Sequence, residues 1–107
     1  MNQVQIYRVD WDSLPWITPL PGARFKVCEA NGRRLRLVEF GRGFKEPDWC
    51  RKGHIGYVLE GEGDLQFSGQ TVRLRAGDGI FIPAGEEHQH LLRVLSDCVR
   101  CVLVEDL

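Results

Sequence analysis

Glycine and proline divide this chain into segments that are too short for helices. The 107 residues include 12 glycines and 5 prolines, and no window of about ten residues shows the apolar repeat of a helix. The segments are rich in β-branched and aromatic residues, and turn residues recur roughly every 8–12 positions. This pattern is typical of antiparallel sandwiches, barrels and jelly rolls. The sequence therefore predicts an all-β fold.

The positions of the glycines, prolines and other turn residues also indicate where the strands are expected. Gln3 to Val9 alternates and is expected to form an edge strand or a strand exchanged with a second copy. The stretch from Asp12 to Gly22 holds three prolines, so we expect an extended, irregular connection there. The remaining expected strands are Ala23–Cys28, Leu35–Phe40, His54–Glu60, Asp64–Phe67, Thr71–Arg75, Ile80–Ile82, His88–Val94 and Cys98–Val104.

Length and charge narrow the class of protein. A chain of 107 residues is expected to form one domain, with residues 1–22 as the N-terminal edge strand and connection and residues 23–107 as the barrel. The net charge of −1 predicts no nucleic-acid partner. No apolar run approaches the roughly 18 residues of a membrane span, and the N-terminus lacks the pattern of a signal peptide. Four scattered cysteines fit reduced thiols, so we expect a cytoplasmic protein.

One run carries more specific information than any other. From Gly77 to His88 the chain reads G-x5-P-x-G-x2-H, a strand, a tight bend, and a second strand that is expected to open on the histidine. This pattern resembles the second sequence motif of the cupin superfamily. The resemblance implies an antiparallel double-stranded β-helix, also called a jelly-roll or cupin barrel. It also implies that His88 points into the barrel and binds a metal.

A second segment resembles the end of the first cupin motif. Tyr57 to Gly63 closes a hairpin on glycine, as that motif does. The usual motif supplies two histidines one residue apart and a glutamate four residues further on. Here the corresponding positions hold Asp48, Cys50 and His54. The usual set of three histidines and one glutamate would therefore become Asp48, Cys50, His54 and His88.

Strand geometry gives an independent reason to group these residues. Side chains at even spacing share one face of a strand, so Asp48, Cys50 and His54 would face the same side. His90 shares parity with His88 and would lie one strand step away, about 7 Å. The candidate metal ligands are thus Cys50, His54, His88, Asp48 and His90. Each also has a plain structural alternative, as a packed, hydrogen-bonded or surface side chain.

Other candidate groups are weaker. Cys98 and Cys101 have the spacing of a zinc or redox pair, but residues three apart on a strand face opposite sides. Glu46 and Lys52 lie close to the predicted barrel mouth and are candidates for proton transfer. The arginines at 33, 34 and 36 are interpreted as a solvated strand edge or turn.

The ligand types restrict the cofactor without naming it. The candidates are divalent Zn, Fe, Ni, Mn or Cu, and a thiolate shifts the preference toward Zn or Cu(I), whereas two histidines with Asp48 would resemble a non-haem Fe(II) site. The resemblance to cupins implies a homodimeric protein that acts on or senses a small polar molecule, with isomerase or dioxygenase chemistry among the options. The alternatives are a metal-free binding module for a small polar ligand or sugar, and an inert partner of another protein.

Overall fold

A computed structural model describes residues 7–107 as nine β-strands with two short 3-10 turns. The strands are β1 (Ile17–Leu20), β2 (Ala23–Ala30), β3 (Arg33–Gly41), β4 (His54–Glu60), β5 (Glu62–Phe67), β6 (Gln70–Arg75), β7 (Gly79–Ile82), β8 (His90–Val94) and β9 (Cys98–Asp106). The turns are η1 (Trp11–Ser13) and η2 (Glu86–His88). All pairings between named strands are antiparallel, which confirms the all-β prediction.

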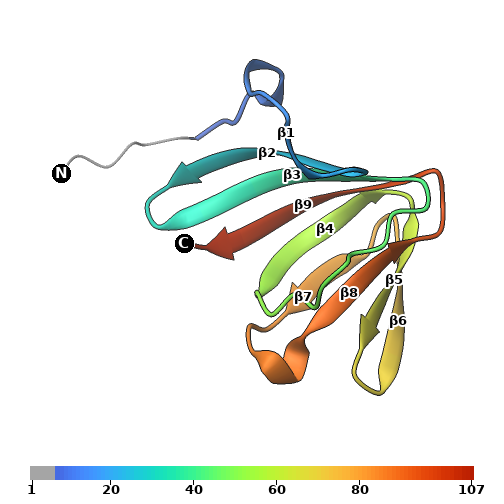
Figure 1. Ribbon diagram of the computed structural model, residues 1–107. Coiled ribbons are helices and arrows are strands. Elements are labelled where there is room, and N and C mark those ends of the chain that lie inside the picture. The colour runs from blue at the N-terminus through green and yellow to red at the C-terminus, as the bar shows by residue number, and fades with distance from the viewer. Residues whose placement is uncertain (1–6) are drawn as a thin grey trace.

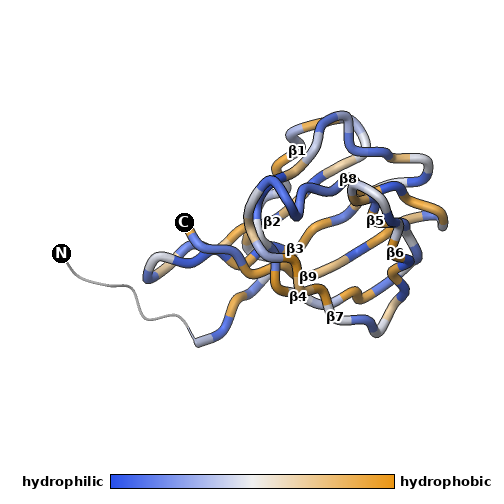
Figure 2. Tube along the Cα trace, turned by 90° about the horizontal axis from the view of Figure 1, so that it is seen from below, coloured by the Kyte–Doolittle hydropathy of each residue, from blue (hydrophilic) through white to orange (hydrophobic). Residues whose placement is uncertain are grey.

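The strands form two sheets that enclose an interior (Figure 1). Six strands pair in the order β1-β2-β3-β9-β4-β7, and three pair in the order β6-β5-β8. Seen from below, the smaller sheet faces the larger one across the interior (Figure 2). Strands distant in sequence, such as β3 and β9, are neighbours in the sheet, as a jelly roll requires.

The β2–β3 hairpin illustrates how local sequence sets strand register. Asn31 and Gly32 both have positive φ angles, 53° and 77°. This is the backbone of a type I′ turn, which asparagine and glycine adopt most readily and whose twist matches the flanking strands. The turn fixes the pairing of Ala30 with Arg33 and, seven pairs further along, of Ala23 with Phe40.

The interior is lined by alternate residues of the strands. Val38, Val58, Cys101 and Leu103 are buried on the inner face of the larger sheet, and Leu65 and Leu92 face them from the smaller one. Val58 is the most enclosed, with 1% of its surface exposed. The intervening residues of β4 and β7 face outward. The parity of each strand therefore determines which side chains reach the interior.

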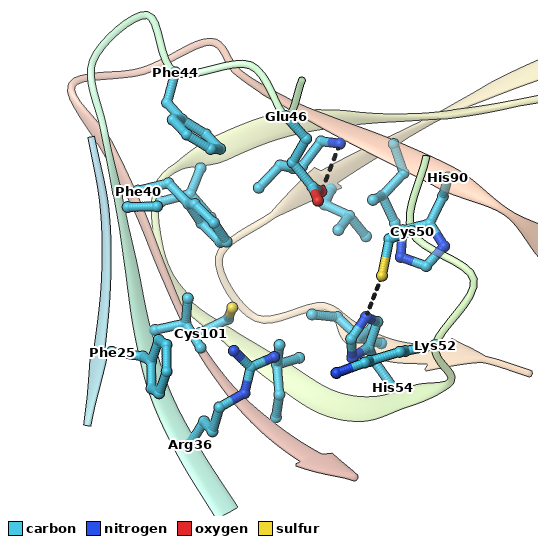
Figure 3. Close-up of a pocket in the computed structure, with 18 of the residues that line it drawn as sticks. Phe25, Arg36, Phe40, Phe44, Glu46, Cys50, Lys52, His54, His90 and Cys101 are labelled. Atoms are coloured by element: carbon cyan, nitrogen blue, oxygen red, sulfur yellow. Dashed lines mark hydrogen bonds between the residues drawn. The ribbon is translucent and has the colours of Figure 1, made fainter. Parts of the chain in front are cut away.

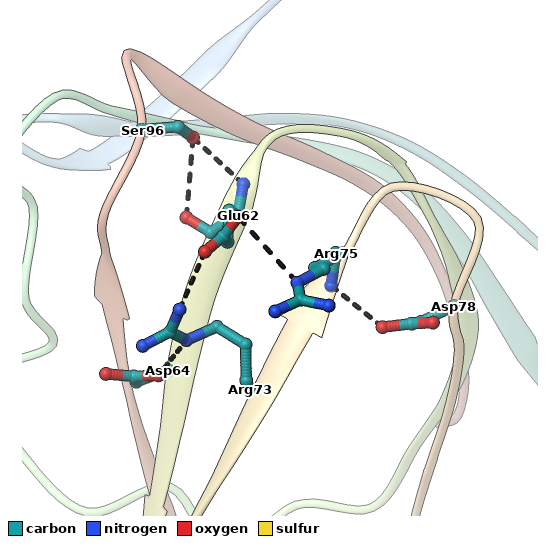
Figure 4. Close-up of polar contacts among 6 residues, drawn as sticks. All are labelled: Glu62, Asp64, Arg73, Arg75, Asp78 and Ser96. Atoms are coloured by element: carbon teal, nitrogen blue, oxygen red, sulfur yellow. Dashed lines mark hydrogen bonds and ion pairs between the residues drawn. The ribbon is translucent and has the colours of Figure 1, made fainter.

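Charged side chains tie the outer surface of the β5–β6 hairpin together (Figure 4). Arg73 on β6 contacts Asp64 at 2.6 Å and Glu62 at 2.7 Å, both on β5. The backbone N–H of Glu62 also donates a hydrogen bond, at 2.9 Å, to the side-chain Oγ of Ser96 in the loop before β9. This network lies on the outside of the smaller sheet, away from the interior.

Strand positions were predicted closely, with three differences. First, the connection expected from Asp12 to Gly22 contains β1, an edge strand that tolerates Pro19 because an edge leaves backbone donors unpaired. Second, the strand expected to open at His88 begins at His90, because residues 86–88 form η2. Third, residues 3–6 of the strand expected from Gln3 to Val9 lie outside the described residues, and residues 7–9 are not in a strand. No helix in the described part of the chain is long and apolar enough to cross a membrane.

Candidate metal centre

Three of the predicted ligands meet inside the barrel. Cys50, His54 and His90 each offer one ligand atom, and these atoms all lie within 4.8 Å of one another. The Cys50 Sγ is 3.5 Å from the Nε2 of His54 (Figure 3). The two imidazole rings are 5.3 Å apart between centroids, in an edge-to-face arrangement. Both histidines are buried and Cys50 is half-buried, so the cluster is largely screened from solvent.

Backbone pairing explains why Cys50 and His90 lie together. The two residues form an isolated β-bridge in which Cys50 N donates to His90 O at 2.9 Å and His90 N donates to Cys50 O at 3.0 Å. Directly opposed residues of an antiparallel pair project to the same side. His54 opens β4, where it pairs with Ile82 of β7, and its inward parity turns the ring toward the other two.

A buried charge network anchors His54. Its Nδ1 is 2.6 Å from a carboxylate oxygen of Glu105, a contact that is short but lacks the angle of a well-formed hydrogen bond. Arg36 binds the same carboxylate through two hydrogen bonds. Its Nε donates to one oxygen at 2.8 Å and its Nη2 donates to the other at 2.6 Å. Glu105 and Arg36 therefore fix the orientation of the ring, and the Nε2 of His54 is left on the side of Cys50.

His90 is anchored in a parallel way by the backbone. Its Nδ1 lies 3.0 Å from the carbonyl oxygen of His88, which can only accept, so Nδ1 carries the proton. The other nitrogen of the ring, Nε2, is then free to act as a ligand. Phe67 of β5 packs against the ring, with centroids 5.9 Å apart, and limits its rotation.

The cluster perturbs the ionisation of its own members. Contacts with His54 and His90 lower the pKa of Cys50 to about 5, so its thiol is ionised at neutral pH. Burial opposes protonation of His54, but its contacts with Cys50 and Glu105 outweigh burial and raise its pKa to about 9. The pKa of His90 is also raised, against the effect of burial, chiefly by Cys50. Burial would raise the pKa of Glu105, yet His54 and Arg36 lower it to about 2.

Glu46 adds an acidic group to the wall beside the cluster. It lies in the loop between β3 and β4 and lines the same cavity as Cys50, His54 and His90. One carboxylate oxygen accepts a hydrogen bond from the backbone N–H of Leu92 at 3.0 Å. Burial, with a smaller contribution from the Cys50 thiolate, raises the pKa of Glu46. This carboxyl group is therefore easier to protonate near neutral pH than an exposed one.

Two predicted ligands lie outside this cluster. His88 sits at the end of η2 with 40% of its side chain exposed, and its Nε2 is 3.8 Å from the carboxylate of Glu87. Gly85, with a φ of 127°, starts this turn and interrupts the strand that the parity argument required. His88 reaches the site only through its backbone carbonyl. Asp48 lies at an exposed bend, where strand parity does not apply.

Sequence reasoning missed the residues that support His54. Arg36 was interpreted as part of a solvated basic cluster, and Glu105 was not singled out. The alternation of side chains along two strands could have identified both residues. Arg36 shares a face with Val38, and Glu105 shares a face with Leu103, so both charges occupy inner-face positions. A charged residue that alternates in step with core residues needs a buried partner.

A cavity of about 300 Å³ adjoins the cluster. Its wall is mainly apolar, and the polar side chains gather toward one end (Figure 3). Cys101 lies in this wall, where burial raises the pKa of its thiol to about 12, so it stays neutral. The cavity is large enough for a small molecule in contact with the cluster.

Comparisons with known proteins agree with this architecture. A family model described as the cupin domain matches residues 41–102, more than half of the chain. Among solved structures, KdgF from Halomonas sp. has a TM-score of 0.76 at 22% identity, covering 97% of this chain and 96% of that one. No curated protein sequence matches the chain.

Two further structures are similar over most of their length. The polyketide cyclase RemF from Streptomyces resistomycificus has a TM-score of 0.77 at 23% identity, over 95% of this chain and 80% of that one. A cupin sugar phosphate isomerase from Silicibacter pomeroyi has a TM-score of 0.76 at 18% identity, over 94% and 76% respectively. Identities this low establish a shared fold alone.

Proposed function

We propose that this protein, a small single-domain member of the cupin family, binds one divalent transition-metal ion through Cys50, His54 and His90. The observation that carries the proposal is the arrangement of hydrogen-bond partners around the two rings. Each Nδ1 faces an acceptor, Glu105 or the His88 carbonyl, which leaves Nε2 for a ligand. Histidines that bind metals almost always engage their second nitrogen in this way.

The donor set favours zinc among the candidate ions. One thiolate and two imidazoles are ligands that Zn²⁺ binds readily, and three protein ligands leave a position for water or substrate. Copper and iron remain alternatives that the elemental analysis below would distinguish. When bound, such an ion would polarise an oxygen atom of a small molecule or lower the pKa of a water molecule.

The residues of the chain would prepare the site for a small molecule. The Cys50 thiolate is already formed at neutral pH, so one ligand needs no deprotonation. Glu46, with its raised pKa, is suited to give or accept a proton at an oxygen atom of a molecule in the cavity. The apolar wall would exclude water from that oxygen.

A metal-free binding module is the second candidate, and one observation favours it. Each charged side chain of the cluster has an oppositely charged neighbour even without an ion. An ionised Cys50 pairs with a protonated His54, and His54 pairs in turn with Glu105. Such a chain of alternating charges is stable in the absence of metal. The cavity would then bind a ligand directly.

Elemental analysis separates the two candidates. Purified protein would be stripped with a chelator, reloaded with Zn²⁺, Fe²⁺, Ni²⁺, Mn²⁺ or Cu²⁺ in turn, and desalted. The metal proposal expects about one ion per chain, with zinc retained best. Protein that retains none of the five ions would favour the metal-free module.

We also propose that a second copy of the chain covers the outer face of the larger sheet. An apolar row crosses four strands at one register level, through Leu35, Val104, Ile55 and Phe81. Ile55 and Phe81 are 54% and 79% exposed. Across four strands this row is about 15–20 Å long. A dimer interface buries about 800 Å² per partner, so neighbouring rows of the same face would contribute to it as well.

Charge supports a second copy as the occupant. Another row of the same face alternates in sign, with Glu39 paired to Arg24 at 2.7 Å and also to Arg100. When the charges on a face are neutralised within one copy of the chain, that face does not repel the same face of a second copy. A reducing, cytoplasmic location is proposed as well, and the four free thiols support it.

A further inference from the structure

The cavity beside the metal centre divides into a polar end and an apolar body. Figure 3 shows Cys50, His54 and His90 on one side, with Phe25, Phe40 and Phe44 across from them. The three phenylalanines come from β2, from β3 and from the loop after it. Phe40 and Phe44 stack with centroids 5.2 Å apart, so this wall is a continuous aromatic surface.

The polar side chains that line the cavity are mostly committed to one another. Two of the three guanidinium nitrogens of Arg36, Nε and Nη2, donate hydrogen bonds to Glu105. The Nδ1 atoms of His54 and His90 face Glu105 and the His88 carbonyl. Among the described lining residues, the groups left for a ligand include the metal-facing donors, the second oxygen of Glu46, the Lys52 ammonium and the Nη1 of Arg36. All of these except the Arg36 nitrogen, whose guanidinium lies 5.0 Å from the centre of the Phe25 ring, belong to the polar end.

This distribution argues against a sugar in the body of the cavity. A sugar carries a hydroxyl group on nearly every carbon, and the apolar wall offers these groups no partner. Each hydroxyl that is buried unpaired lowers affinity by about tenfold. An aromatic or aliphatic body instead gains from contact with the phenylalanines.

We propose that the ligand of this site is a small carboxylate with an aromatic or aliphatic body of about ten non-hydrogen atoms. The size follows from the cavity of 300 Å³, since one water-sized group takes about 30 Å³ of liquid volume. The carboxylate lies at the polar end, where Lys52 and a bound cation carry positive charge. The body lies against the phenylalanines. The carboxylate contact rests on the proposed metal site, whereas the apolar preference rests on the cavity alone.

Titration with size-matched probes tests this inference. Phenylacetate and octanoate would be compared with ribonate by calorimetry, on zinc-loaded protein and on chelator-stripped protein. We expect phenylacetate or octanoate to bind the loaded protein at least tenfold more tightly than ribonate. Ribonate binding that equals or exceeds that of both apolar probes would overturn the inference.

A variant that fills part of the cavity tests whether the probe binds inside it. Cys101→Met adds volume on the inner face of β9, and Val102→Met introduces the same side chain one residue further on, on the outer face. Cys101→Met should weaken phenylacetate binding about tenfold, while Val102→Met should leave it unchanged. Equal binding by wild type and a folded Cys101→Met variant would contradict the assignment. If Cys101→Met does not fold, the probe comparison on wild type still decides.

The zinc content of each sample keeps this inference separate from the metal proposal. Protein that binds one zinc ion yet prefers ribonate would refute the apolar ligand and leave the metal centre intact. Protein that binds no zinc yet prefers phenylacetate would refute the metal centre and leave the cavity preference standing.

Discussion

The substitution Glu105→Gln probes the network that holds His54. The change keeps the shape of the side chain and one acceptor oxygen for Arg36, but it removes the charge 2.6 Å from Nδ1 of His54. A neutral amide holds an imidazole N–H less strongly than a carboxylate does, and it makes Nε2 a weaker ligand. The metal centre should therefore bind more weakly while its three ligands stay in place.

The magnitude follows from the two kinds of hydrogen bond. In a well-formed hydrogen bond a charged partner contributes about 1.5–3 kcal/mol and a neutral one about 0.5–1.5 kcal/mol. The contact of His54 with Glu105 is short but not ideally aligned, so the exchange is expected to cost about 1–1.5 kcal/mol and not the full range of that difference. Since 1.4 kcal/mol is about a factor of ten, zinc affinity should fall roughly tenfold. Substitutions of supporting residues in metal sites commonly cost about 10–100-fold, so this value lies at the lower end.

A competition titration with a chromophoric chelator would measure the effect. Glu39→Gln is the matched control. Like Glu105, Glu39 lies on the larger sheet and forms ion pairs with arginine, here with Arg24 and Arg100, but its side chain faces outward. Its substitution should leave zinc affinity unchanged. Urea unfolding of each metal-free variant would show that both are folded. Unchanged affinity in Glu105→Gln, or an equal loss in Glu39→Gln, would refute the role assigned to Glu105.

Three further predictions concern protonation and assembly. The Cys50 pKa is lowered to about 5, so between that pH and the ordinary pKa of a thiol, Cys50 is ionised in the folded metal-free chain and protonated in the unfolded chain. In urea titrations, wild type should therefore be more stable than Cys50→Ser by an amount that grows by about 1 kcal/mol from pH 5 to 6.5, after allowance for solvent screening. A difference that stays constant over this range would contradict an ionised Cys50 in the folded chain. Because the His54 pKa of about 9 keeps that ring protonated at pH 7, zinc binding should release at least one proton, measurable by calorimetry in buffers of different ionisation enthalpy, and release of none would argue against Nε2 as a ligand. Phe81→Glu should convert a dimer to a monomer in sedimentation experiments while Thr71→Glu, on the outer face of β6, should not, and a wild-type monomer would exclude the proposed interface.

The fold was predictable because its signals are local. Turn residues and alternation placed β4 at His54–Glu60, where the structure has it, and placed most other strand ends within two residues. The pairing of β3 with β9 could not be inferred in this way, since it joins segments about 65 residues apart through contacts that no local pattern records. Only the resemblance to cupins implied this arrangement.

Strand parity placed two of the candidate side chains correctly, whereas which residues bind a metal stays a prediction. The position of His54 on β4 and the parity shared by His88 and His90 both came from alternation, and His54 and His90 meet in the cluster. The argument failed at His88, because Gly85 and the two following glutamates form a 3-10 turn and not a strand. It failed at Asp48 because the chain bends before Cys50. Long-range partners such as Glu105 depend on the tertiary fold and lay beyond local reasoning.

The most direct test compares two histidines that are two residues apart. His90→Ala removes a ligand of the proposed centre, and His88→Ala removes an exposed side chain whose contribution is only its carbonyl. Zinc content after reloading and desalting would be measured for both variants, for Cys50→Ser and for wild type. The proposal predicts about one ion per chain in wild type and in His88→Ala, and little or none in His90→Ala and Cys50→Ser. Loss of zinc in His88→Ala with retention in His90→Ala would contradict it.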